Sequence, residues 1–86
     1  MFYMNDVTDY RTDAPNGLYL AVSDQTYDRC GELITSSIPL VVRGGILLPR
    51  SVDRAAKDLV RRHPQYCFLE EIRWAGGESF TLSFGS

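Results

Sequence analysis

Cysteine and long hydrophobic runs are scarce in this sequence, and each scarcity excludes a class of protein. The 86 residues include two cysteines, Cys30 and Cys67. They are too few for the disulfide framework of a small secreted domain and lack CxxC spacing, so we expect both to be reduced and buried. No apolar run approaches the ~20 residues of a membrane span, and residues 1–6 lack the basic and apolar parts of a signal peptide. We therefore expect a cytoplasmic protein that does not act at a membrane.

Groups with catalytic or metal-binding chemistry are also sparse. The single histidine, His63, lies at the end of a predicted helix with no evident Cys or Ser partner. The glycine pairs Gly44-Gly45 and Gly76-Gly77 lie between predicted strands, so neither forms the strand-to-helix loop that binds phosphate. The N-terminal aspartates match no calcium-loop pattern. The sequence therefore predicts a protein that is not an enzyme and that has no cofactor and no metal site.

Charge is nearly balanced in total but unevenly distributed along the chain. Nine Lys and Arg residues oppose eleven Asp and Glu residues, a formal charge of −2. Residues 1–32 hold six acidic and two basic residues, a net of −4, whereas residues 43–62 hold six basic and two acidic residues, a net of +4. We expect a dipolar molecule with no overall attraction to nucleic acid.

Length and composition fit one domain. With 44 % hydrophobic and 23 % charged residues, residues 1–86 match an ordinary globular chain. Residues 1–16 have no clear periodicity and are expected to form a loosely ordered N-terminal arm. The apolar run of residues 18–22 predicts a strand.

Two hairpins and one helix follow. Residues 38–43 and 46–49 flank the first glycine pair, and residues 67–74 and 80–84 flank the second, so each pair of segments predicts a hairpin. Residues 51–63 predict an amphipathic helix that begins at the N-cap Ser51 and ends before a proline. Its apolar face consists of Val52, Ala55, Ala56, Leu59 and Val60.

Residues 24–36 have two alternative interpretations. As a helix, they give the ferredoxin-like order βαββαβ plus a final strand. As a strand, they pair back on residues 18–22 through a turn near Asp24 and Gln25. In both cases we expect an α+β fold, a small and mostly antiparallel sheet of four to five strands with helix 51–63 packed on one face.

One candidate contact surface is the outer face of the predicted helix. Arg50, Arg54, Lys57 and Arg61 fall on one side of it, opposite the apolar face. Such a stripe can bind phosphates or an acidic partner. The alternative is a solvated face with the i, i+4 pairs Asp53–Lys57, Arg54–Asp58 and Asp58–Arg62.

The acidic N-terminal half is a second candidate. Asp24, Tyr27 and Asp28 combine tyrosine with carboxylates, a composition found at protein interfaces and also on ordinary soluble surfaces. Trp74, at the tip of the last hairpin, is either a lid on the core or an anchor for a partner.

These features predict a small non-catalytic module that binds a protein partner. We expect an inhibitor or adaptor that covers a surface of a larger protein, such as a phage or mobile-element inhibitor of a nucleic-acid-processing host system. The alternative is a nucleic-acid-binding domain that uses the basic helix face of residues 50–62. A homodimer is an open alternative, and the sequence does not decide between the two contact surfaces.

Overall fold

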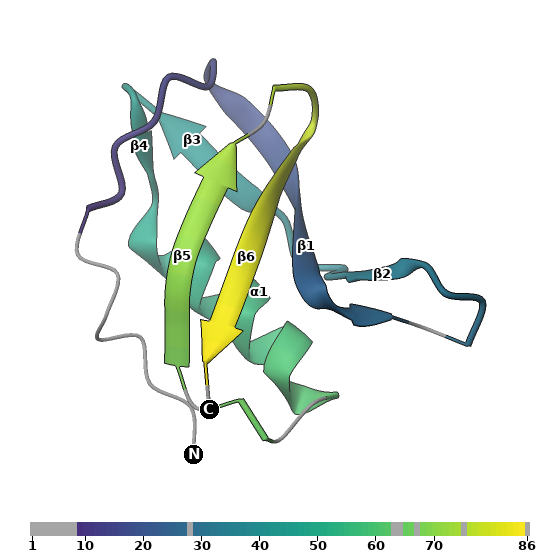
Figure 1. The fold of residues 1–86 in the computed structure, drawn as a ribbon. Coiled ribbons are helices and arrows are strands. Elements are labelled where there is room, and N and C mark those ends of the chain that lie inside the picture. Colours follow the sequence, from purple (N-terminus) through teal and green to yellow (C-terminus); the bar gives the residue numbers. More distant parts are fainter. Residues whose placement is uncertain (1–8, 28, 63–64, 67, 75, 86) are drawn as a thin grey trace.

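The protein folds as one helix and a mixed, curled sheet, an α+β arrangement (Figure 1). The computed structural model describes residues 9–85 except 28, 63, 64, 67 and 75, and omits the side chain of residue 26. The elements in chain order are β1 (Gly17–Tyr27), β2 (Leu33–Thr35), β3 (Leu40–Arg43), β4 (Ile46–Leu47), α1 (Pro49–Arg61), β5 (Phe68–Trp74) and β6 (Ser79–Gly85).

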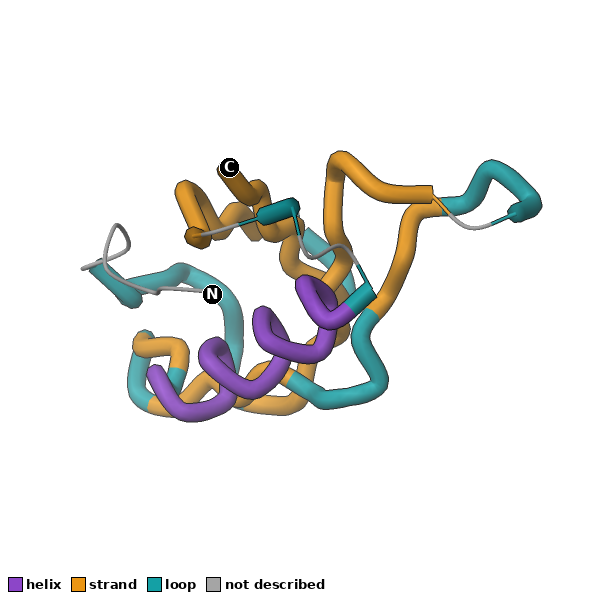
Figure 2. Tube along the Cα trace, turned by 90° about the horizontal axis from the view of Figure 1, so that it is seen from below, coloured by secondary structure: helices purple, strands orange, loops and turns teal. Residues whose placement is uncertain are grey.

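The long strand β1 is the centre of the sheet, whose order is β4-β3-β1-β6-β5. One edge of β1 pairs with β6 in parallel, and the other edge pairs with β3 and β2 in antiparallel fashion. The outer pairs, β3 with β4 and β5 with β6, are antiparallel. The observed sheet agrees only roughly with the prediction of a mostly antiparallel sheet that has the helix on one face. A parallel pair lies at its centre, and the sheet is curled (Figure 2).

Residues 24–27 and 33–35 lie in strands, so the helical alternative and the ferredoxin-like order are wrong. β1 continues to Tyr27, and β2 pairs back on it with Thr35 opposite Val22. The turn follows Tyr27 and does not lie near residues 24 and 25. Gly31, with φ of 80°, has the left-handed backbone that glycine adopts most readily. Together β1 and β2 form a hairpin arm that projects from the body of the protein (Figures 1 and 2).

The helix begins two residues before the predicted start. Pro49 occupies its first turn, where a missing N–H costs nothing, and Leu48 is the N-cap in place of Ser51. The Ser51 hydroxyl donates to Leu48 O at 2.8 Å and accepts from Val41 N at 3.0 Å, so it joins the helix to β3. The helix ends at Arg61, and the predicted end at residue 63 lies outside the described residues.

The core lies between α1 and the sheet. All five residues of the predicted apolar helix face are buried, as are the alternating residues Phe80, Leu82 and Phe84 of β6. Gly44 and Gly45 have φ of 61° and 75° and connect β3 to β4, as the first hairpin requires.

The described part of the N-terminal segment lies beside β4. Thr12 N donates to Gly45 O at 2.9 Å, and Leu47 N donates to Tyr10 O at 2.8 Å. Residues 1–8 lie outside the described residues. Cys30 is exposed at the arm's turn, so its expected burial is wrong, and Cys67 is not among the described residues. Within the described part of the chain, α1 is the one helix, and it is too short and too polar to span a membrane.

Candidate functional site

The predicted basic stripe of Arg50, Arg54, Lys57 and Arg61 is exposed along α1. Arg50 lies within the helix, as the alignment of the stripe requires. Lys57 Nζ lies 3.0 Å from Asp53 Oδ2, so this expected pair forms. Within the part of the chain that the structure describes, Arg50 and Arg54 form no ion pair. The basic stripe therefore combines neutralised and unneutralised charges.

Asp58 is the buried charge of the helix, with 7 % of its surface exposed. Its Oδ2 accepts a hydrogen bond of 2.8 Å from Ser36 Oγ, in the connection between β2 and β3. Arg61 and Arg62 lie 3.9 and 3.8 Å from its oxygens. The expected Asp58–Arg62 pair thus forms, but an Arg54–Asp58 pair does not. Asp58 therefore fastens the helix to the sheet connection and is not part of a solvated row of ion pairs.

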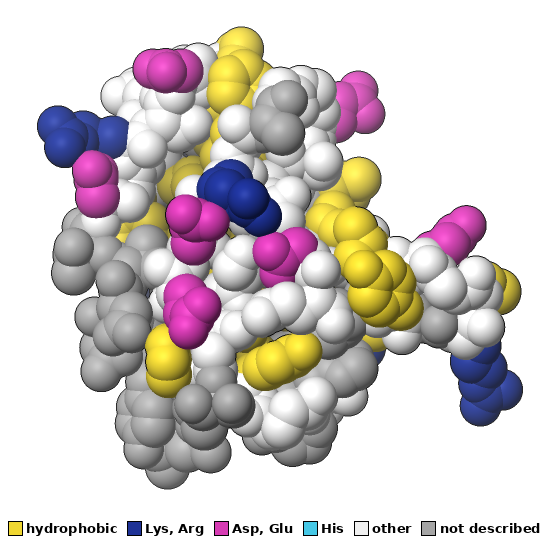
Figure 3. All heavy atoms as spheres, viewed as in Figure 1, with side chains coloured by type: hydrophobic (Ala, Val, Ile, Leu, Met, Phe, Trp, Pro, Cys, Tyr) yellow, Lys and Arg dark blue, Asp and Glu magenta, His cyan; other side chains and the backbone are white. Residues whose placement is uncertain are grey.

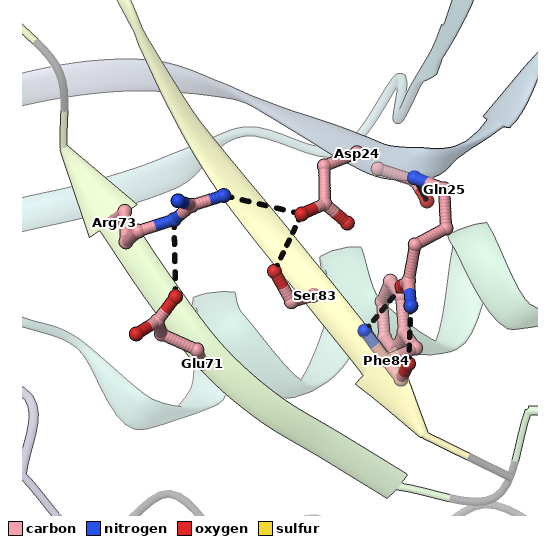
Figure 4. Close-up of polar contacts among 7 residues, drawn as sticks. Asp24, Gln25, Glu71, Arg73, Ser83 and Phe84 are labelled. Carbon is pink, nitrogen blue, oxygen red and sulfur yellow. Dashed lines mark hydrogen bonds and ion pairs between the residues drawn. The ribbon is translucent and has the colours of Figure 1, made fainter.

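On the outer face of the sheet, a polar cluster joins β1, β5 and β6 (Figure 4). Asp24 Oδ2 accepts hydrogen bonds from Ser83 Oγ at 2.7 Å and from Arg73 Nη2 at 3.1 Å. Arg73 Nε in turn lies 3.0 Å from Glu71 Oε1. Asp24, a predicted contact residue, therefore uses its carboxylate to hold three strands together.

The side chain of Gln25 forms hydrogen bonds to the backbone of β6 beyond the point where the backbone pairing of β1 with β6 ends. Backbone pairing between these strands ends with Ser23 opposite Leu82. Beyond that point Gln25 Nε2 donates to Phe84 O at 2.7 Å, and Phe84 N donates to Gln25 Oε1 at 2.6 Å (Figure 4). Asp24 and Gln25 thus fix the base of the arm, where β1 leaves the sheet.

Beyond its base, the arm carries two exposed apolar side chains. Tyr27 and Leu33 are direct partners across β1 and β2, and they are 58 % and 41 % exposed. The predicted contact residue Asp28 falls outside the described residues. Tyr27 is therefore the predicted interface residue that the structure places fully at the surface of the arm.

Trp74 contacts the core more than the solvent. It is half-buried, its ring centroid lies 6.4 Å from that of Phe80, and its Nε1 donates to Gly77 O at 3.2 Å. These contacts favour the core-lid interpretation of Trp74 over the partner-anchor interpretation.

Exposed apolar side chains are concentrated on β1 and β2. Of the five large hydrophobic residues that are exposed in the described part of the chain, four lie on these strands. We call these four the apolar strip: Leu18 (69 % exposed), Leu20 (50 %), Tyr27 and Leu33. Figure 3 shows hydrophobic side chains gathered on the outer face beside the base of the arm.

The sequence held a signal for the apolar strip that composition alone does not reveal. All five residues of 18–22 are apolar, whereas a strand with one wet face alternates apolar and polar residues. In the structure Tyr19 and Ala21 are buried, at 8 % and 0 % exposure, and the leucines between and before them face solvent. Because successive residues of a strand point to opposite faces, a continuous apolar run indicates that both faces of the strand are apolar.

The described part of the N-terminal segment contains side chains with shifted pKa values, among them Asp9 and Tyr10. Arg11 donates two hydrogen bonds of 3.0 Å from its guanidinium to Asp9, which lower the pKa of Asp9 to about 2. Burial raises the pKa of Tyr10. The described residues contain no group of three or more His, Cys, Asp or Glu side chains that could hold a metal ion.

The two predicted contact surfaces lie on different sides of the molecule. Figure 4 shows Asp24 and Arg73 in front of the sheet and α1 behind it. The structure therefore does not bring the basic stripe together with Asp24 and Tyr27, and each must be judged as a separate surface. Comparisons of the chain with protein-family models, with curated proteins and with solved structures find no match.

Proposed function

We propose that the protein is a non-catalytic binding module, an inhibitor or adaptor that covers an apolar surface of a larger protein through its apolar strip. The observation that carries this proposal is the exposure of Leu18 and Leu20 on a strand whose other side is in the core. Single exposed leucines are common on protein surfaces, but large apolar side chains gathered on adjacent strands mark interaction sites.

The fastening of the arm supports the same function. An isolated two-stranded hairpin is only marginally stable in water, so the outer part of the arm depends on its base for order. Asp24 and Gln25 supply that order through four hydrogen bonds to Arg73, Ser83 and Phe84. Because the arm is ordered before a partner arrives, binding loses less conformational entropy.

A phage or mobile-element inhibitor of a nucleic-acid-processing host system is one form that such a module takes. Its action would be steric, because covering a surface needs no reacting group on the module itself. The apolar strip supplies the contact, and the polar cluster beside it supplies the hydrogen-bonding rim that protein interfaces have.

Affinity capture with the tagged full-length protein tests the proposal. We expect a stoichiometric protein partner from a lysate of its native cell. The double variant Leu18→Ser/Leu20→Ser should lose the partner, because burial of one leucine contributes about 1.5–3 kcal/mol. The matched control Arg50→Gln/Arg54→Gln changes two exposed residues on α1 and should retain it. Loss of the partner by the control alone, or by neither variant, would contradict the proposal.

Nucleic-acid binding is the second candidate, favoured by the exposed guanidinium groups of Arg50 and Arg54, which form no ion pair with any residue that the structure describes. A band shift of labelled DNA or RNA at moderate salt tests it. If the wild type shifts the probe and Arg50→Gln/Arg54→Gln does not, the basic stripe is the functional surface and the binding-module proposal falls.

A further inference from the structure

A hollow opens at the N-terminal end of the apolar strip, where β1 meets β3. Its volume is about 390 Å³. The hollow is lined by Asn16, Gly17, Leu18, Val41, Val42 and Arg43. Leu18 and Val41 are direct partners across the two strands, so their neighbouring side chains form an apolar floor. Because Leu18 belongs to both, the hollow continues the apolar strip.

Backbone and side-chain bonds fix the shape of the hollow. Gly17 pairs with Val42 in the sheet, and Asn16 Oδ1 accepts a hydrogen bond of 2.9 Å from Gly44 N. The chain that enters β1 is therefore tied to the turn between β3 and β4. The hollow is formed before any ligand binds, which is usual for small ligand sites.

Arg43 supplies the one formal charge in the lining. It is exposed, and among the described residues its guanidinium takes part in no ion pair or hydrogen bond. A guanidinium group presents a rigid set of donors that matches a carboxylate in two parallel hydrogen bonds. An apolar floor with a free guanidinium at its rim fits a ligand that carries an apolar group beside a carboxylate.

We infer that this hollow anchors the partner by taking an apolar side chain that has a carboxylate next to it. The inference rests on the proposed function, because it names the group that the partner offers to one end of the apolar strip. Anchoring of one side chain in a preformed hollow is typical of the residues that contribute most to protein interfaces.

Titration of the ¹⁵N-labelled full-length protein with N-acetylphenylalanine tests the inference. We expect saturable changes in the amide signals of Gly17, Leu18, Val42 and Arg43. The uncharged probe N-acetylphenylalanine amide should bind about tenfold more weakly, because it lacks the carboxylate. Arg43→Gln should remove this preference for the charged probe, whereas Arg54→Gln, which changes a free arginine on α1, should preserve it.

Two results would overturn the inference: no saturable change with N-acetylphenylalanine, or equal affinity for both probes in the wild type. Thermal unfolding of Arg43→Gln should match the wild type, because Arg43 is exposed and pairs with none of the described residues. The titration is independent of partner capture. If N-acetylphenylalanine fails to bind while Leu18→Ser/Leu20→Ser still loses the partner, the hollow is misassigned but the proposed function stands.

Discussion

The side-chain amide of Gln25 bonds both the N–H and the C=O of Phe84, and so acts as one more peptide unit in the pairing of β1 with β6. Because the Gln25 side chain bonds to the Phe84 backbone, β1 can diverge from β6 while the N–H and C=O of Phe84 remain hydrogen-bonded. The arm, with Tyr27 and Leu33 on it, therefore depends on a side chain that an inspection of the sequence would assign to an exposed strand position.

Gln25→Met tests this role of the amide. Methionine keeps the length of the side chain but offers no donor and only a weak acceptor, so the two hydrogen bonds between Gln25 and the Phe84 backbone are lost. Because Gln25 is exposed and water can partly replace it, we expect a loss of about 1 kcal/mol in the free energy of unfolding. Urea unfolding measures this loss, and amide exchange at Phe84 should become faster.

Thr35→Val provides the control for the Gln25 variant. Thr35 is an exposed residue of β2, and within the described part of the chain its side chain makes no hydrogen bond. We expect its effect to stay within about 0.5 kcal/mol. Equal effects of the two variants, or unchanged exchange at Phe84 in Gln25→Met, would show that the amide does not hold the strands.

The buried bond between Ser36 and Asp58 should matter more than the surface pair on the same helix. Ser36→Ala leaves a buried carboxylate oxygen without its donor, and we expect a loss of about 1–3 kcal/mol in the free energy of unfolding. Asp53→Asn, which removes the exposed pair with Lys57, should change it by less than about 0.5 kcal/mol. Chemical unfolding compares the two, and equal losses would contradict the fastening role of Asp58.

The pair of Asp9 and Arg11 predicts a measurable shift at low pH. The pKa of Asp9 is lowered from 3.8 to about 2 because its ionised form accepts hydrogen bonds from Arg11. Its contribution to folding is therefore complete above pH 3.8 and is lost as the pH falls toward 2. Arg11→Gln should return the pKa of Asp9 toward 3.8, as measured by NMR of the carboxyl carbon. An unchanged pKa in this variant would refute the assignment.

Local pattern was sufficient to predict most elements of the fold. The alternation of Phe80, Leu82 and Phe84 and the apolar period of the helix both follow from burial of one face, which depends only on nearby residues. The Gly44-Gly45 turn is likewise local. The start of the helix was misplaced because Ser51 is a good N-cap by residue type, whereas Pro49 at the first turn extends the helix backwards.

Contacts between segments that are distant in the sequence could not be predicted. The parallel alignment of β1 with β6 joins segments almost sixty residues apart, and no local pattern specifies it. The same holds for Asp24, whose role depends on Arg73 and Ser83 in two distant strands. The basic stripe was predictable because a helix face is a local property. For the apolar strip, the sequence shows the continuous apolar run of residues 18–22 but not its exposure, which depends on what covers β1.

Amide hydrogen exchange on the complex with the captured partner tests the central claim most directly. The proposed function predicts slower exchange at Leu18, Leu20 and Leu33 in the complex than in the free protein, with exchange along α1 unchanged. Slower exchange confined to the residues of α1 around Arg50 and Arg54, with none in β1 or β2, would contradict the claim that the apolar strip is the binding surface.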